Sequence, residues 1–394
     1  MQKQDALKQN PLTVVKLLWC GQGRTALVEI YNDGVEKEEA DFLGLVDCGG
    51  DREYAQGALD YIARKVKARY RKWLDLVVVT QQDASHVGLF EDLGRRLQPL
   101  RARVFTVFVA GGKGSVPEPV KAFLTLLKYN LRQVEFDSPM QNSYLRGTRA
   151  GLGWISEHNG TYFRILASNL VTRCFTERAA SNVLVVENGR FAVVLPGDAG
   201  IDTINEINRI PNLGELLPPV LAFAVPHLGV LATAVRNRVA GGSGPDDQWA
   251  AVEKFAKAVS PQNIAASAGP FNPFDHPAQE VIDLFKQPVP DKAHWYVSYV
   301  LRGQGAESEG WRTWQSEVGI RTTVEAFGDV VMPGTDPAAV HDGTRFWYGD
   351  IVYSFRLRPL LPEPEATVEF VPRGTPRTPG TPGANEAVVR APEP

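Results

Sequence analysis

The chain of 394 residues carries a formal net charge of -3, with a sequence pI of about 6.1. This balance excludes a molecule-wide positive field of the kind that holds non-specific nucleic-acid binders on phosphate, so a nucleic-acid partner is not indicated by charge. Hydrophobic residues make up 44% of the sequence, enough to fill a sizeable core, and the three cysteines form no CxxC pair that would suggest a zinc finger.

The N-terminal residues 1–11 form a polar leader. They lack the apolar segment and small-residue cleavage site of a signal peptide. Nowhere does an uninterrupted apolar run reach the roughly 18 residues that a bilayer-spanning helix needs. We therefore expect a cytoplasmic protein without a membrane partner.

The first part of the chain alternates between apolar strands and amphipathic helices. Apolar, β-branched runs predict strands, and apolar residues at helical spacing predict helices. The expected strands are 13–20, 26–30, 42–46, 76–79 and 104–109, and the expected helices are 54–73, 89–97 and 120–131.

The second part continues the same alternation up to residue 357. Strands are expected at 162–166, 183–186, 191–195, 264–268, 295–301 and 350–357, and helices at 246–258 and 280–285. Apolar strands interleaved with amphipathic helices predict an α/β architecture in which helices cover the sheets. Residues 12–357 are thus expected to form one domain. The proline-rich segment 358–394 is expected to be a disordered tail that could recruit a protein partner.

The segment Val77–Leu89 holds the first candidate site residues. A buried strand that runs through a short polar loop into a helix places Asp83 and His86 at one edge of the sheet, where α/β proteins often build sites. A hydrogen-bonded helix cap and a metal ligand are both open interpretations of His86, and the cap is the commoner one for an isolated histidine.

Two further apolar strands end in residues of the same kind. Asp198 follows the strand at 191–195, and it could cap the helix that begins near Ile201 or present a carboxylate to a metal. His227 follows another apolar run. If the three strand ends meet, then His86, Asp198 and His227 supply two imidazoles and one carboxylate, a set that suits zinc, manganese or iron.

Six segments, taken in chain order, resemble the metallo-β-lactamase domain of ComEC-type competence proteins and their soluble relatives. The resemblance covers roughly residues 12–357 and implies a four-layer αββα metallo-β-lactamase sandwich. The segments are CGQG (20–23), LGLVDCGG (43–50), TQQDASHVG (80–88), PGDAG (196–200), VPHLG (225–229) and SAGPFNPFDHPAQEV (267–281).

The resemblance assigns roles to residues that match these motifs. It implies a metal held by His86, Asp198 and His227, with Asp83 and Ser85 at the catalytic positions of the metal signature. The positions that would support the pocket are Asp47, Gln81, Asn272 and His276.

The chain also departs from the family pattern at the positions where catalysis depends on donors. Gln81 stands where the first histidine of the signature belongs, Ser85 where an aspartate belongs, and Leu228 where a second histidine belongs. Arg24 replaces the acidic residue that normally follows the opening glycine turn. Neutral side chains are poor substitutes for metal ligands, so a two-metal centre is not expected.

Two functions remain open from the sequence, and whether the chain is an enzyme is one of the open points. The favoured one is a catalytically impaired or inactive binding or assembly module, which binds a protein partner through the tail or the fold surface. The alternative is a single-metal hydrolase, similar to phosphodiesterases or nucleases, that uses His86, Asp198 and His227. The matching cofactor alternatives are no metal, or one zinc or manganese ion.

A run of basic residues lies on the predicted helix before the signature strand. Given the acidic pI, we expect a solvated helix face there rather than a phosphate-binding patch. The residues are Arg64, Lys65, Lys67, Arg69, Arg71 and Lys72.

Overall fold

The structure is a computed structural model, and most of the chain up to residue 266 is described in it. The described residues are 10–110, 116–136, 154–167, 181–224, 245–266, 284–285, 294–297, 299–301, 346–356 and 366–372. None of the helices within these ranges is both long enough and apolar enough to cross a membrane.

The first sheet is mixed and has nine strands among the described residues, with the spatial order β14-β15-β1-β2-β3-β4-β5-β6 and β16 paired to β15. Strands β1 to β3 run antiparallel, whereas β3 to β6 are parallel. The strands are β1 (Leu12–Leu17), β2 (Thr25–Tyr31), β3 (Phe42–Cys48), β4 (Trp73–Val79), β5 (Arg103–Val109), β6 (Glu135–Phe136), β14 (Tyr299–Leu301), β15 (Phe346–Arg356) and β16 (Ala366–Pro372).

The second sheet is also mixed, with seven strands in the described part of the chain, in the order β13-β12-β11-β10-β9-β8-β7. Strands β7 to β10 are antiparallel, and β10 to β13 are parallel. The strands are β7 (Trp154–His158), β8 (Thr161–Ala167), β9 (Val183–Glu187), β10 (Ala192–Leu195), β11 (Val220–Ala224), β12 (Asn263–Ala266) and β13 (His294–Val297).

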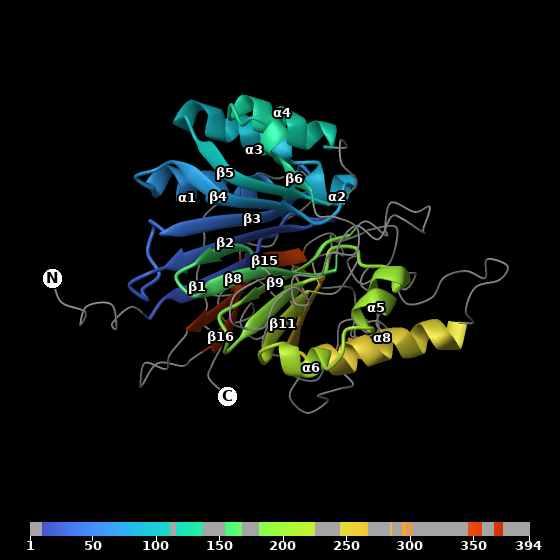
Figure 1. The fold of residues 1–394 in the computed structure, drawn as a ribbon. Coiled ribbons are helices and arrows are strands. Elements are labelled where there is room, and N and C mark those ends of the chain that lie inside the picture. The colour runs from blue at the N-terminus through green and yellow to red at the C-terminus, as the bar shows by residue number, and fades with distance from the viewer. Residues whose placement is uncertain are drawn as a thin grey trace, which may run out of the picture.

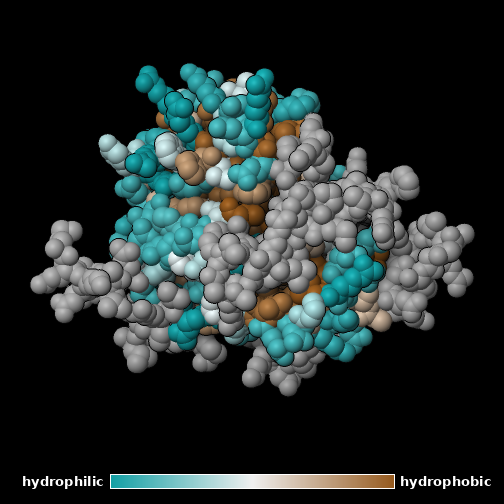
Figure 2. All heavy atoms as spheres, viewed as in Figure 1, coloured by the Kyte–Doolittle hydropathy of each residue, from teal (hydrophilic) through white to brown (hydrophobic). Residues whose placement is uncertain are grey.

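Helices cover the outer face of each sheet (Figure 1). In that view α1, α3 and α4 lie over the first sheet, and α5, α6 and α8 lie along the second. The helices are α1 (Gln56–Ala68), α2 (Ala84–Val87), α3 (Phe90–Leu97), α4 (Glu118–Leu126), α5 (Ile201–Ile207), α6 (Leu213–Leu216) and α8 (Pro245–Val259), with short 3₁₀ turns at Gln98–Leu100 and Leu131–Gln133. Figure 2, in the same view as Figure 1, shows hydrophilic side chains over α3 and α4 at the top and hydrophobic residues nearer the centre of the view.

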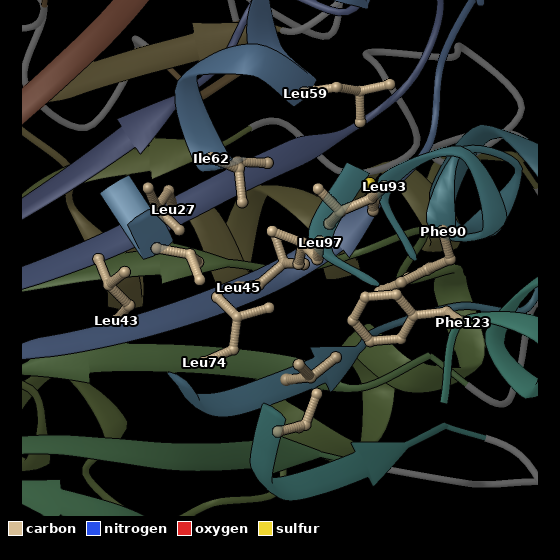
Figure 3. Packing of buried hydrophobic residues seen from close by; sticks show 14 of the residues in the cluster. Leu27, Leu43, Leu45, Leu59, Ile62, Leu74, Phe90, Leu93, Leu97 and Phe123 are labelled. Carbon is tan, nitrogen blue, oxygen red and sulfur yellow. The ribbon is translucent and has the colours of Figure 1, made fainter. Parts of the chain in front are cut away.

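Three hydrophobic clusters correspond to the three interfaces of four layers. The central cluster joins the two sheets and includes Val28 from the first sheet and Val186 from the second. The first sheet packs against its helices through residues such as Leu45, Ile62 and Phe123 (Figure 3). A third cluster packs the second sheet against α5, α6 and α8. Both faces of each sheet are therefore covered, which explains why the strands are apolar on both sides. The predicted α/β, four-layer αββα arrangement is confirmed.

Two sequence predictions need correction. The helix expected to reach residue 73 ends at Ala68, and Trp73 already opens β4. Within the expected disordered tail, Ala366–Pro372 forms β16, which pairs antiparallel with β15. The alternation of polar and apolar residues from Thr367 to Phe370 is a strand pattern that the surrounding prolines obscured. The rest of the tail lies outside the described residues.

The expectation of a solvated basic helix face is wrong for Lys65 and Arg69, because both are buried. Lys65 Nζ lies 3.1 Å from Oε2 of Glu29, a fully buried carboxylate in the middle of β2. Lys16 Nζ lies 3.8 Å from Oε1 of Glu29. The hydroxyls of Tyr31 and Tyr61 donate hydrogen bonds to the Glu29 carboxylate. Two amines and two hydroxyls thus compensate one buried charge.

Removing the charge of Glu29 should destabilise the fold strongly. In Glu29→Gln the buried ammonium of Lys65 loses its counter-ion, and breaking a buried ion pair in this way typically lowers the free energy of unfolding by about 3 kcal/mol. Urea denaturation of the purified variant measures this change. Glu91→Gln, which removes an exposed i,i+4 pair with Arg95, is the matched control and should change stability by less than about 1 kcal/mol. Equal effects of the two substitutions would contradict the prediction.

The same carboxylate should give a defined dependence of stability on pH. Burial alone raises the pKa of Glu29, but Lys16 and Lys65 more than offset this and hold the pKa below its ordinary value of 4.5. Because the pKa of Glu29 is lower in the folded state, its ionised carboxylate stabilises the fold above pH 4.5. This stabilisation is lost as the pH falls below that value and the carboxylate becomes protonated. The stability difference between the wild type and Glu29→Gln should therefore narrow below pH 4.5. A constant difference across urea titrations from pH 7 to pH 3 would rule this out.

Candidate functional site

The candidate site lies where loops at the carboxyl ends of strands from both sheets meet. Thr80 follows β4 of the first sheet, and Pro196 follows β10 of the second. The loop after β4 is joined directly to the second sheet, because the backbone N–H of Asn182, just before β9, donates to the carbonyl of Thr80 at 2.9 Å. Side chains that follow different sheets are thereby brought to one point.

His86 is the centre of this meeting point and is completely buried. Its Nδ1 lies 2.8 Å from Oδ2 of Asp47, and its Nε2 lies 2.8 Å from Oδ1 of Asp198. The two carboxylates come from different sheets, since Asp47 belongs to β3 and Asp198 follows β10. The imidazole therefore bridges the sandwich by two hydrogen bonds.

Asp47 is fixed in an unusual backbone conformation. Its φ of 58° falls in the left-handed region, which is uncommon for a residue other than glycine. The backbone N–H of Thr80 donates to Oδ1 of Asp47 at 2.6 Å, and the Thr80 hydroxyl donates to Oδ2. Both carboxylate oxygens are thus used, and Asp47 orients the ring of His86.

Asp198 does not cap the following helix. The residue at the N-cap of α5 is Gly200, so the capping interpretation of Asp198 is wrong and its carboxylate contacts His86 instead. The turn before it depends on Gly197, whose φ is +58° and whose position would bring a Cβ within 2.9 Å of Thr80 Oγ1. The close approach of the loop after β10 to Thr80 therefore brings Asp198 to His86.

The two carboxylates change the acid–base behaviour of His86. Burial alone lowers the pKa of the imidazole, because an apolar environment disfavours the charged form. The charges of Asp198 and Asp47, together with their hydrogen bonds, more than offset this and raise the pKa to about 10. At neutral pH the ring is thus an imidazolium that donates a proton on each nitrogen.

A second cation, Arg24, is enclosed beside these groups, with only 3% of its surface exposed. Its Nη1 donates to the carbonyl of Gly197 at 2.9 Å, next to Asp198. Burial lowers the pKa of the guanidinium, and the carboxylates of Asp198 and Asp47 oppose this change. Arginine remains charged in proteins, so two buried cations accompany two buried carboxylates here.

The remaining signature residues have structural contacts. Gln81 is buried, and its Oε1 accepts a hydrogen bond from Ser181 Oγ at 2.8 Å. Asp83 is the half-buried N-cap of α2 and makes no side-chain capping bond. Ser85 is half-buried, and its carbonyl accepts a hydrogen bond from the backbone N–H of Arg24 at 2.8 Å.

Three candidate residues, His227, Asn272 and His276, lie outside the described residues, so the site they were expected to complete is seen only in part. Sequence reasoning missed Thr80 and Ser181. The position of Thr80, directly after an apolar strand and before the signature, is a signal that could have found it. Ser181 precedes the strand 183–186 by two residues and carries no comparable signal.

The described donors do not fit a zinc centre. Within this part of the chain, no group of three or more His, Cys, Asp and Glu side chains is arranged to hold a metal ion. Asp47 and Asp198 contact opposite nitrogens of His86 and so lie on opposite sides of its ring. Two donors on one tetrahedral zinc lie about 3.3 Å apart, because each bond is about 2.0–2.1 Å long. His86 Nε2 and Asp198 Oδ1 are 2.8 Å apart, a hydrogen-bond distance.

The sequence matches no known family profile and no curated protein. Among solved structures, the chain is similar to the metallo-β-lactamase fold protein YhfI from Bacillus subtilis, at 12% identity over 73% of this chain and 96% of that one, with a TM-score of 0.38. It is also similar to CmlA, a diiron β-hydroxylase from Streptomyces venezuelae, at 13% identity over 72% of this chain and a TM-score of 0.38. The matched part spans 53% of CmlA.

Close packing of the loops gives a test of the geometry. A Cβ at Gly49 would lie 2.1 Å from the carbonyl oxygen of Ser85, so Gly49→Ala must push the loop of β3 away from α2. Overpacking of this kind should lower the free energy of unfolding by about 3 kcal/mol in urea denaturation. Gly200→Ala is the matched control, because a Cβ there meets nothing within 4 Å, and its stability should be near that of the wild type.

Proposed function

We propose that this chain is a metallo-β-lactamase-like protein of the ComEC-like branch that acts as a binding or assembly module, with its pocket catalytically impaired or inactive. The ComEC-like assignment rests on the order of the six sequence segments. The four-layer fold supports it, since the described segments 43–50, 80–88 and 196–200 lie at strand ends of a helix-covered double sheet.

One observation carries the proposal. Both ring nitrogens of His86 are engaged by buried carboxylates at 2.8 Å, so neither nitrogen offers a free lone pair to an ion. A metal-dependent hydrolase needs an open coordination position where water is activated. In the described part of the site, the corresponding groups bond to one another.

The substituted signature residues support the same conclusion. The side chain of Gln81, after β4, accepts a hydrogen bond from Ser181, before β9. The carbonyl of Ser85 accepts one from the backbone N–H of Arg24. These positions therefore stabilise the loop junction. A binding module needs such a rigid junction, because it presents a surface without undergoing chemistry.

An exposed aromatic cluster on the first sheet supports a role in binding another protein. The rings of Trp73 and Phe105 stack with centroids 5.9 Å apart, and the guanidinium of Arg71 lies 5.3 Å from the Trp73 centroid. Phe105 is 66% exposed, and nearby Tyr70 is 91% exposed. Tryptophan, tyrosine and arginine are the residues enriched at the energetic centres of protein interfaces.

A second candidate function, a single-metal hydrolase, has one observation in its favour. Asp47 accepts from Nδ1 of His86 and leaves Nε2 turned toward Asp198, which is the way carboxylates orient metal-binding histidines. In that case His86, Asp198 and His227 would hold one zinc or manganese ion, and Asp83 would be a fourth ligand or a base. The ion would activate water for attack on a phosphodiester.

Elemental analysis and an assay on a chromogenic phosphodiester separate the two functions. We expect substoichiometric zinc and manganese in protein purified without chelator, and no hydrolysis above background with either ion added. His86→Ala should then leave both readouts unchanged, as should His158→Ala, the matched control on β7. Stoichiometric metal that is lost in His86→Ala and retained in His158→Ala would establish the hydrolase and reject the binding module.

A further inference from the structure

Three parallel strands of the first sheet begin side by side, and their starts share exposed apolar side chains. Strands β3, β4 and β5 are parallel neighbours, so their first residues lie at one edge of the sheet. Three of the four large hydrophobic side chains that are exposed in the described part of the chain belong to this edge. Val35 lies in the loop before β3, Tyr70 precedes β4, and Phe105 is the third residue of β5. Exposed apolar side chains gathered in one place mark an interaction surface.

The two outer strands of these three carry opposite charges at their starts. The loop 33–41 before β3 has five carboxylates and one lysine. Three of these carboxylates pair with nearby cations, whereas the exposed Glu39 accepts a hydrogen bond from the backbone N–H of Tyr70 and has no cationic partner among the described residues. Arg101 and Arg103, at the start of β5, are exposed and form no ion pair with a described residue. Acidic, aromatic and basic groups thus follow one another across the edge.

The aromatic side chains lie at the centre of this arrangement. The rings of Trp73 and Phe105 stack with 12° between their planes, and the guanidinium of Arg71 contacts the Trp73 ring. Trp73 and Arg103 are register partners, and Phe105 is two residues further along β5. Because side chains alternate along a strand, these three residues share one face of the sheet. The stacked rings form a rigid apolar surface, which needs little ordering when a partner covers it.

We propose that this edge is the contact surface of a symmetric dimer, in which a second copy of the chain covers the aromatic cluster. Strands β3 and β5 each lie one strand spacing, about 4.8 Å, from β4. A twofold axis through the start of β4 therefore places the start of β3 in one copy opposite the start of β5 in the other. Glu39 of each copy then faces Arg103 of the other copy. A twofold interface requires a self-complementary surface of this kind.

Charge selects the occupant. The acidic and the basic groups that a partner must match are both present on this edge, so a second copy complements it. A polyanion such as single-stranded nucleic acid would approach the carboxylates of the loop 33–41 as well as the arginines.

The inference deepens the proposed function, because it rests on a binding or assembly module and names a second copy as the partner. The contact surface is separate from the candidate site. Strand β4 runs from Trp73 at this edge to Val79, next to Thr80, over a length of about 20 Å. Substitutions at the edge therefore leave the contacts of His86 unchanged.

The first test measures the mass of the wild type and of two variants by sedimentation equilibrium. The surface is small, so we expect the 43.3 kDa of one chain at about 1 µM and an approach to twice that mass at about 200 µM. Tyr70→Ala should raise the dissociation constant by at least about 30-fold, as truncation of a central interface aromatic does. Leu131→Ala is the matched control and should not change it. Leu131 is the fourth exposed hydrophobic residue, and it precedes β6, which pairs with the end of β5.

The second test exchanges the two charges that face each other. Glu39→Arg and Arg103→Glu each place like charges in opposition at both ends of the interface, so each variant should be monomeric at about 200 µM. An equimolar mixture of the two should regain the dimer mass, because every contact in the mixed pair joins opposite charges. Both positions are exposed, so circular dichroism of each variant should match the wild type. If either variant does not fold, the comparison of Tyr70→Ala with Leu131→Ala decides.

Several results would overturn the dimer. They are a wild type that stays monomeric at about 200 µM, a mixture that fails to regain the dimer mass, and equal effects of Tyr70→Ala and Leu131→Ala. Binding of labelled oligothymidylate by a monomeric wild type would assign the edge to nucleic acid instead. The metal measurement stays independent of these results. A metal-free monomer retains the binding module without this partner, and stoichiometric metal lost in His86→Ala rejects the module whatever the mass.

Discussion

The burial of two carboxylates at the junction of the two sheets is the constraint on which the site depends. Asp47 and Asp198 are enclosed, and each needs a positive partner or hydrogen-bond donors to be tolerated there. His86 satisfies one side of each carboxylate, and Arg24 is enclosed beside them, with its Nη1 donating to the carbonyl of Gly197 next to Asp198. Because His86 hydrogen-bonds to both carboxylates, a change at one of these three residues leaves a buried polar group of another without its partner, so they behave as a unit rather than as separate pairs.

The same unit also holds the sandwich together at this edge. Asp47 belongs to the first sheet and Asp198 follows a strand of the second, so the path through His86 connects two sheets whose shared interface is formed mainly by apolar side chains. The apolar interface lacks direction, whereas hydrogen bonds fix a distance and an angle. The hydrogen bonds through His86 can therefore determine how the loops that carry Asp47 and Asp198 are placed relative to each other. The central hydrophobic cluster supplies most of the stability.

The sequence predicted the layers well, because alternating apolar strands and amphipathic helices depend on local periodicity. It also singled out Asp47, His86 and Asp198, whose side chains hydrogen-bond in the structure. It could not predict that Lys65 is buried, because its partner Glu29 is 36 positions earlier in the sequence and meets it only when α1 packs on β2. It noted Arg24 only as a departure from a motif. The contacts of Arg24 come from three segments that are distant in the chain.

A charge-balanced set of side chains differs from a metal centre in how it responds to the loss of a ligand. A metal centre depends on several converging donors, and affinity falls when donors are removed. Under the proposed function the described donors bond to one another, so Gln81 and Ser85 can occupy signature positions without leaving an ion poorly coordinated. In the proposed binding module, substituted ligands and buried carboxylates are thus compatible, because Asp47 and Asp198 both hydrogen-bond to donors within the protein.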